Sequence, residues 1–199
     1  MSRGYLPLAF VAAATMVCAQ PAIAAENVTM VEAAMVDALA PNQFVWNDPA
    51  TPEPVRIVVN IAEQRAYVYR GEALIAATTV STGKEGKDTP SGTFTILQKN
   101  IDHKSSLYNS APMPFMQRLT WDGIAIHAGK NPGFPASHGC IRVPLAFAKK
   151  LYGITTTGTQ VTVIGPDGLV DPTPNSAAPD AEARETAAAN TAGLRVASR

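Results

Sequence analysis

The sequence predicts a mainly β domain, a small barrel-like or sandwiched sheet with one helix. Short runs of β-branched and aromatic residues recur between positions 55 and 164, and Gly- and Pro-rich segments separate them. Only one stretch combines a convincing helical period with a start and a stop signal. Hydrophobic residues make up 46% of the 199 residues, so a core can form around these strands.

The first 24 residues predict a secretory signal peptide. Arg3 gives a positive start, residues 6–19 are almost wholly apolar, and Ala22-Ile23-Ala24 suits a cleavage site. The apolar run is short for a membrane span, so we expect no span after cleavage, with an uncleaved anchor as the alternative. The segment therefore predicts export across the inner membrane to the periplasm or cell envelope.

Two segments flank the catalytic domain that we expect at 52–166. Residues 25–51 are a lead-in, with weak helical spacing over 28–40 followed by a proline-rich linker. The sequence leaves open whether this lead-in packs on the domain. Residues 167–199 are rich in alanine, proline and aspartate and have almost no large apolar side chain, which predicts a disordered tail.

The first half of the domain reads as successive strands. Three runs predict an antiparallel meander, at 56–61, 66–69 and 74–81. A loop is expected over 82–92 and another strand over 93–98. Residues 100–114 are polar and interrupted by prolines, which predicts a long surface excursion. The last strand of the domain is expected at 160–164.

A hairpin and the helix lie in the second half. Asp122-Gly123 separates the apolar runs 119–121 and 124–126, and glycine tolerates the positive φ of a tight hairpin turn. We expect the helix at 144–152, because proline occupies its first turn and Gly153 follows its apolar period.

The charge balance argues against two classes of partner. Lysine plus arginine and aspartate plus glutamate number 16 each, so the net charge is zero. Without a basic excess the chain has no general attraction to nucleic acid, and without an acidic excess it does not mimic a polyanion. We therefore expect no nucleic-acid partner.

Candidate catalytic residues are concentrated near one cysteine. Cys140 is the only cysteine after the expected cleavage site, although exported proteins usually pair their cysteines. A lone exported thiol is either buried and inert or present for its chemistry. His127 and His138 lie close to it in the sequence, and an imidazole can take the proton of a thiol. These residues favour acyl transfer by a cysteine.

The surrounding residues fit the same chemistry. We expect the positive end of the following helix to favour the thiolate of Cys140, and Gly139 to let amide N–H groups approach an oxyanion. Arg142 offers a forked donor for a carboxylate. A zinc site formed by both histidines and the cysteine is the chemical alternative. His103 lies apart from this group and is expected to be solvated.

The motif itself resembles a known family. The segment Ser137-His138-Gly139-Cys140-Ile141-Arg142, preceded by Ile126-His127, resembles the L,D-transpeptidases with a YkuD-type catalytic domain. The stretches at 80–83 and 89–94 resemble a second recurring segment of that family. The resemblance covers about residues 55–165, nearly the whole expected domain, and implies the mainly β fold of the YkuD-type domain.

The resemblance also implies catalytic roles. Cys140 would be the nucleophile and His127 the general base, and the backbone carbonyl of Ala128 would orient the base. His138 would shape the site or donate a hydrogen bond, and the amides of Gly139 and Cys140 would form the oxyanion hole. No metal or cofactor is implied.

Three residues are implied to border the substrate, namely Arg142, Ser137 and Ala128. Two features depart from many family members. Only nine residues separate His127 from Ser137, and alanine occupies position 128, where glycine is frequent. The short loop between the two segments therefore bears on acceptor specificity more than on the chemistry.

The activity implied is peptidoglycan L,D-transpeptidation. A stem tetrapeptide would acylate the cysteine with loss of its terminal D-alanine, and an amine acceptor would resolve the thioester. The acceptor would be a second stem peptide, giving a cross-link, or an amine-bearing protein anchored to the wall. Three alternatives remain open at this point: an L,D-carboxypeptidase that uses water, a non-catalytic wall-binding module and a metal-dependent hydrolase.

Overall fold

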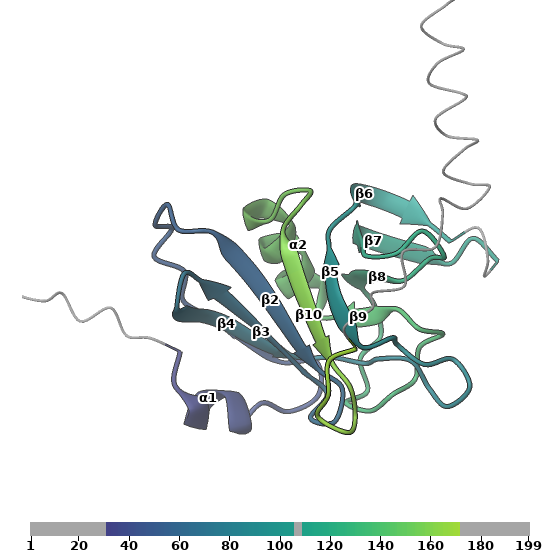
Figure 1. Ribbon diagram of the computed structural model, residues 1–199, viewed down its shortest axis with the longest axis horizontal. Coiled ribbons are helices and arrows are strands. Elements are labelled where there is room, and N and C mark those ends of the chain that lie inside the picture. Colours follow the sequence, from purple (N-terminus) through teal and green to yellow (C-terminus); the bar gives the residue numbers. More distant parts are fainter. Residues whose placement is uncertain (1–30, 106–108, 172–199) are drawn as a thin grey trace, which may run out of the picture.

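The computed structural model describes residues 31–105 and 109–171, which form two β-sheets and two helices (Figure 1). The expected signal peptide at 1–24 and most of the expected tail at 167–199 lie outside these residues. Within them, none of the helices is long and apolar enough to span a membrane. The mainly β fold class is confirmed.

The larger sheet has six strands in the order β1-β4-β3-β2-β10-β5. The predicted meander is confirmed, because β2, β3 and β4 pair antiparallel in succession. Strand β10 pairs parallel with β2 on one side and antiparallel with β5 on the other. The strands are β1 (Phe44–Trp46), β2 (Val55–Asn60), β3 (Arg65–Arg70), β4 (Ala73–Thr79), β5 (Gly92–Thr95) and β10 (Gln160–Ile164).

The smaller sheet has four strands in the order β6-β7-β8-β9. Its first three strands pair antiparallel, whereas β8 and β9 run parallel. Figure 1 shows the two sheets side by side, with β5 next to the smaller one. The strands are β6 (Gln98–Lys104), β7 (Pro112–Arg118), β8 (Ala125–Ala128) and β9 (Ile141–Val143).

The expectation of a surface excursion over 100–114 is wrong, because most of this segment belongs to the β6–β7 hairpin. The polar side chains of β6 are largely exposed at the sheet edge, so the strand lacks an apolar face in the sequence. Pro112 and Pro114 are tolerated in β7 because β8 pairs only with Gln117 and Arg118. Beyond those two residues, β7 needs no backbone donors on that side.

The hairpin around Asp122-Gly123 is present but wider than predicted. Strand β7 ends at Arg118, so the expected strand at 119–121 is wrong. The carbonyl of Ile124 accepts hydrogen bonds from the N–H groups of Leu119 and Thr120, at 2.8 and 3.2 Å. Gly123 has a φ of 107°, the positive value that the turn requires. The connection is therefore a six-residue turn over 119–124.

Helix α2 (Leu145–Ile154) begins after Pro144 and continues through Gly153, two residues beyond the prediction. The ammonium of Lys99 donates to the carbonyls of Tyr152 and Thr155, at 2.7 and 2.6 Å. These bonds satisfy acceptors at the end of the helix, which the sequence does not reveal because β6 supplies the lysine.

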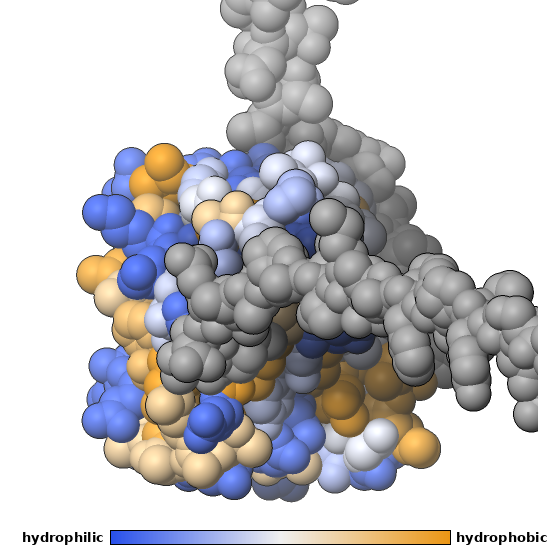
Figure 2. All heavy atoms as spheres, turned by 90° about the vertical axis from the view of Figure 1, so that its left-hand side faces the viewer, coloured by the Kyte–Doolittle hydropathy of each residue, from blue (hydrophilic) through white to orange (hydrophobic). Residues whose placement is uncertain are grey.

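The main core lies between the two sheets and α2. Phe147 and Leu151 of the helix are buried against strands of both sheets. On the side of the molecule that lies at the left in Figure 1, apolar and polar residues are intermixed at the surface (Figure 2). The fully buried aliphatic side chains of this core include Ile57, Val59, Val68, Ile75, Ile96, Ile126, Ile141, Val161 and Val163.

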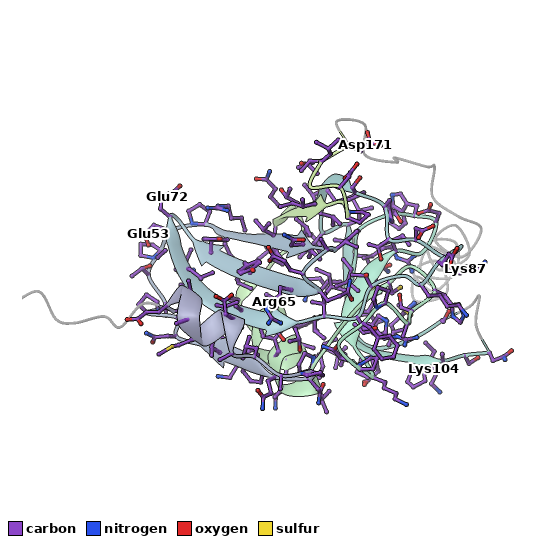
Figure 3. The ribbon with its side chains drawn as sticks, turned by 90° about the horizontal axis from the view of Figure 1, so that it is seen from below. Glu53, Arg65, Glu72, Lys87, Lys104 and Asp171 are labelled. Carbon is purple, nitrogen blue, oxygen red and sulfur yellow. The ribbon has the colours of Figure 1, made fainter. Side chains whose placement is uncertain are left out.

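The described part of the lead-in packs on the domain. Helix α1 is shorter than the spacing suggested and spans only Ala33–Asp37. Strand β1 extends the larger sheet, and the rings of Phe44 and Trp46 meet Phe147 edge-on, with centroids 5.7 and 5.6 Å apart. Figure 3 shows Arg65 beside α1, where its guanidinium donates to backbone carbonyls at 3.3 and 3.4 Å.

A stability test follows from the contact between β1 and α2. Trp46→Ala should lower the free energy of unfolding by about 2 kcal/mol, roughly half the cost of deleting a fully buried aromatic side chain. Phe134→Ala is the matched control, because this ring is 60% exposed and its loss should change little. Urea unfolding of both variants measures the effect. Equal midpoints would show that the lead-in contributes no packing energy.

Candidate active site

The parallel pairing of β8 with β9 brings the two predicted catalytic segments together. His127 lies within β8 and pairs with Arg142 of β9, and Cys140 is the residue directly before β9. Both strands are flanked by core residues, because Ile126 and Ile141 are buried on them. The alternation of side chains along these strands therefore places the apolar residues in the core and leaves the polar ones at the site.

A cavity of about 660 Å³ opens at this point. Of the seven residues proposed for the site from the sequence, all except Gly139 line it. The six are His127, Ala128, Ser137, His138, Cys140 and Arg142.

The imidazole of His127 is oriented by the backbone of its own strand. Its Nδ1 lies 2.8 Å from the carbonyl oxygen of Ala128, and because a carbonyl can only accept, Nδ1 carries the ring proton. Burial lowers the pKa of His127 to about 4, against the opposing effect of this hydrogen bond, and the nearby Arg142 lowers it further. At neutral pH the ring is therefore uncharged and its other nitrogen can accept a proton.

The side chain of Cys140 rests in its protonated form. Sγ donates to the carbonyl of Gly123 at 3.3 Å, and the residue is half-buried. Burial raises the pKa of Cys140, whereas the N–H of Ala125 and the cations of Arg142 and Arg118 act in the opposite direction. The resting pair is therefore an uncharged thiol and an uncharged imidazole.

The sequence suggested that the start of helix α2 favours the thiolate of Cys140. Strand β9 separates Cys140 from the start of α2 at Leu145, and the effect of a helix terminus fades within about one turn. Leu145 at the start of α2 nevertheless lines the same cavity as Cys140, so the contribution of the helix stays a prediction. The groups that lower the pKa of Cys140 come from β7, β8 and β9.

Hydrogen bonds within the motif fix the loop that carries the cysteine. The hydroxyl of Ser137 donates to the carbonyl of Cys140 at 2.5 Å and accepts from the N–H of Gly139 at 3.1 Å. The N–H of Gly139 is thus bonded to Ser137 within the loop, whereas we expected it to donate to an oxyanion. Although Ser137 borders the cavity, it is fully buried and its hydroxyl is bonded within the loop, so its contact with substrate stays a prediction.

The backbone conformation requires glycine at position 139. Its φ is +113°, a value that residues with a side chain rarely adopt. A Cβ there would also lie 2.7 Å from Cδ1 of Ile124, so the tip of that side chain would have to shift. The positive φ is therefore the reason for glycine in the motif.

The stretches at 80–83 and 89–94, which also resemble the family, are hydrogen-bonded to the loop that carries Cys140. Thr89 donates to the carbonyl of Gly139 at 2.7 Å and accepts from the N–H of Gly83 at 2.8 Å. The carbonyl of Thr82 accepts from the N–H groups of Ala136 and Ser137, both at 3.0 Å. The two segments that resemble the family are thus hydrogen-bonded to one another.

Arg142 extends along the floor of the site. A Cβ on Gly129 would lie 3.0 Å from Cγ of Arg142, so the side chain passes directly over that glycine. Its Nη1 donates to the carbonyl of Ala136 at 3.3 Å. The guanidinium is therefore anchored to the loop while it lines the cavity.

Sequence reasoning missed several residues of the cavity wall. His103 was expected to be solvated, but it lies on β6 opposite Met113, is half-buried and lines the cavity. Arg118 lines it from β7 and is 5% exposed. Asn42 reaches it from the lead-in. No local signal marks these residues, because pairing of distant segments places them there.

A metal centre finds no support in the described part of the chain. No three histidine, cysteine, aspartate or glutamate side chains there form a group suited to hold a metal ion. The zinc arrangement considered for His127, His138 and Cys140 is therefore not formed.

Comparison with known proteins matches this fold and site. The family model of the L,D-transpeptidase catalytic domain, YkuD, matches residues 54–163. The chain belongs to this family. YciB of Bacillus subtilis (strain 168), a protein named as an L,D-transpeptidase, is 32% identical over 131 residues, covering 55% of this chain and 65% of YciB. The chain thus spans less than two thirds of that relative.

Solved L,D-transpeptidases have a similar fold. The enzyme from Stackebrandtia nassauensis superposes with a TM-score of 0.52 at 27% identity, covering 58% of this chain and 57% of that one. The Ldtfm-avibactam carbamoyl enzyme superposes with a TM-score of 0.51 at 28% identity, covering 57% and 49%. The L,D-transpeptidase domain therefore has recognisable relatives over its catalytic part.

The neutral resting pair makes a prediction about reactivity. Because the pKa of Cys140 is raised, the thiolate should appear only above the ordinary thiol value of about 8.5. Alkylation by iodoacetamide should therefore keep rising with pH beyond 8.5. Intact-mass rates between pH 5 and 10 measure this, with Cys140→Ala giving the background from Cys18. A plateau below pH 7 would instead indicate a thiolate–imidazolium pair.

Proposed function

We propose that this protein is a peptidoglycan L,D-transpeptidase that acts through a thioester on Cys140. The observation that carries the proposal is the placement of the thiol and an uncharged, backbone-oriented imidazole in one cavity. Membership of the L,D-transpeptidase family supports the class of reaction. The signal-like first 24 residues support action in the periplasm or cell envelope, where stem peptides are found.

The first half-reaction forms the thioester. Nε2 of His127 accepts the proton of Cys140, and the sulfur attacks the carbonyl carbon of the third residue of a stem tetrapeptide. The C–N bond to the terminal D-alanine breaks, and the proton on His127 passes to the departing amine. The products are free D-alanine and an acyl-enzyme, with no change in oxidation state.

The second half-reaction consumes the thioester. An amine acceptor attacks the thioester carbon, His127 takes the amine proton, and the sulfur leaves and regains it. The amine of a second stem peptide gives a cross-link, and the amine of an envelope protein anchors that protein to the wall. In both cases an amide replaces the thioester and the enzyme is regenerated.

The cations beside the sulfur supply electrostatic stabilisation. Arg118 and Arg142 both favour a negative charge on Cys140, and the N–H of Ala125 does the same. The N–H of Cys140 is the oxyanion donor that we retain, since that of Gly139 is bound to Ser137. Ser137 and the carbonyl of Ala128 act as positioning groups.

Solved relatives support a covalent mechanism. The structure of Ldtfm as an avibactam carbamoyl enzyme describes a protein of this fold that carries a covalent adduct. Sequence identity of 28% with that structure supports the extension to this chain. The cysteine is the candidate for the modified group here, because it combines cavity access with a proton acceptor nearby.

Loss of the sulfur nucleophile should abolish turnover. Cys140→Ser should give no acyl adduct and no D-alanine release from a stem tetrapeptide, because an alcohol is a far poorer nucleophile without a strong base. Intact mass and amino-acid analysis measure both products. The wild-type adduct should disappear faster when an amine acceptor is added, whereas loss to water alone would indicate a carboxypeptidase. Wild-type turnover by Cys140→Ser would refute the mechanism.

Loss of the base should slow acylation. His127→Ala should lower the single-turnover acylation rate by about 10²–10⁴-fold, the usual contribution of a positioned general base. Melting temperature and circular dichroism of the variant check that the buried site still folds. An unchanged rate and pH profile in a folded variant would assign the base to another group.

A further inference from the structure

The lead-in contributes to the catalytic cavity although it lies outside the segment that defines the family. The family model begins at residue 54, but Asn42 lines the cavity together with Lys130 and Asn131. The wall made by Asn42, Lys130 and Asn131 is called here the lead-in wall. Asn42 comes from the lead-in, just before β1 of the larger sheet, whereas Lys130 and Asn131 follow β8 of the smaller sheet.

Backbone bonds on one side of Asn42 hold it in place. The carbonyl of Gln43 accepts from the N–H of Thr79 and from the hydroxyl of Thr78, both at 3.1 Å. Asn42 itself has a φ of 64°, in the left-handed region that asparagine tolerates better than most residues. The side chain of Asn42 therefore extends from a backbone that is fixed beside the edge of the larger sheet.

Thr79 also holds Asn131, the residue that the loop after β8 contributes to the lead-in wall. The side-chain amide of Asn131 donates to the carbonyl of Thr79 at 2.7 Å and to its hydroxyl at 3.1 Å. The carbonyl oxygen of that amide accepts from the N–H of Gly133 at 3.1 Å. Thr79 thus joins the lead-in to the loop between the two catalytic segments.

Gly133 of the loop also packs directly against Pro41 of the lead-in. A Cβ on Gly133 would lie 2.6 Å from Cγ of Pro41, and Gly133 has a φ of +88°. The short loop over 128–136 can approach the lead-in this closely only with glycine at that position. The loop that departs from many family members in length is therefore packed against a segment that the family model does not include.

The charges of the cavity indicate what this wall attracts. Among the described residues that line the cavity, Arg118, Lys130 and Arg142 are cationic and Asp122 is the one carboxylate. Lys130 is exposed at the mouth, and Asn42 adds an amide that can donate a hydrogen bond. Ammonium and amide donors at one wall suit a carboxylate, which accepts both.

We propose that Asn42 and Lys130 form a carboxylate-binding subsite, through which the lead-in helps to select the peptide substrate. The proposal rests on the transpeptidase function proposed above. The carboxylate belongs to the donor peptide or to an acceptor peptide, and the two half-reactions distinguish them. Asn42 is then a specificity residue, and Thr79 and Asn131 are positioning residues for the wall.

Variants that change the charge of the lead-in wall test the proposal while keeping the backbone conformation. Asn42→Asp keeps a residue that tolerates the positive φ but repels a carboxylate, and Asn42→Gly keeps the φ and removes the donor. Lys130→Gln removes the cation. Asn100→Asp is the matched control, because Asn100 is exposed on β6 and does not line the cavity. Melting temperatures show whether each variant folds.

The two half-reactions are measured separately. Single-turnover acylation against tetrapeptide concentration reports the donor, and decay of the preformed acyl-enzyme against acceptor peptide concentration reports the acceptor. Asn42→Asp should raise the half-saturating concentration roughly tenfold in one arm, as expected for one like-charge contact near a protein surface. Lys130→Gln and Asn42→Gly should shift the same arm less. A peptide with its carboxylates amidated should remove the penalty.

The outcome separates this proposal from the proposed function. If the wild type forms its adduct and neither Asn42→Asp nor Lys130→Gln differs from Asn100→Asp in either arm, the subsite is refuted while the enzyme stands. If the wild type forms no adduct, the proposed function fails. Calorimetric binding of tetrapeptide and acceptor peptide to Cys140→Ser with and without Asn42→Asp then decides the subsite by itself, and equal affinities for both peptides refute it.

Discussion

The parallel pairing of β8 with β9 is the constraint on which the site depends. Parallel neighbours cannot be joined by a tight turn, so the chain needs a long crossover between them. Here the crossover is the segment over 129–140, and it ends with Cys140, the proposed nucleophile. Because it is neither helix nor strand, other segments must satisfy its backbone groups. Thr82 and Thr89 do so from other segments, and the side chain of Asn131 accepts from the N–H of Gly133 within the loop.

Burial sets the electrostatic state of the reacting groups. The pKa of Cys140 is raised and that of His127 is lowered to about 4, so both rest uncharged despite three cationic side chains in the cavity lining. A protonated thiol is a poor target for oxidation, which suits a lone cysteine in the oxidising compartment that we propose. In the proposed reaction, the cations near Cys140 would stabilise the negative charge that develops on its sulfur.

The short loop and the lead-in act as one structural unit. In this chain the connection from His127 to Ser137 is only nine residues long, and it is packed against Pro41 and linked through Thr79 to Gln43. A segment before the residues that the family model matches thus occupies part of the cavity wall. The lead-in is also held from the other side, because β1 packs its aromatic rings against α2. The proposed catalytic residues and the proposed substrate wall consequently come from different parts of the chain.

Residue pattern alone was sufficient for features that depend on neighbours in sequence. The apolar alternation of the β2–β4 meander, the turn at Asp122-Gly123, the proline that starts α2 and the close grouping of His127 with Cys140 are all local. The motif also carried the family, because Gly139 and Ser137 act on backbone groups within a few residues of the cysteine. Such interactions leave a readable pattern since their geometry depends on short chain separation.

Tertiary structure decided everything that rests on long-range pairing. The polar edge strand β6 has no apolar face to reveal it, so its pairing with β7 and the place of His103 in the cavity were hidden. Asn42 reaches the site only because β1 joins β4 across the larger sheet. The protonation of Cys140 depends on burial by distant segments, which no local residue pattern reveals. The sequence by itself thus determined the chemical groups and their class of reaction, whereas the fold determined their charge state and the wall that faces them, because desolvation and cavity shape depend on every segment that packs there.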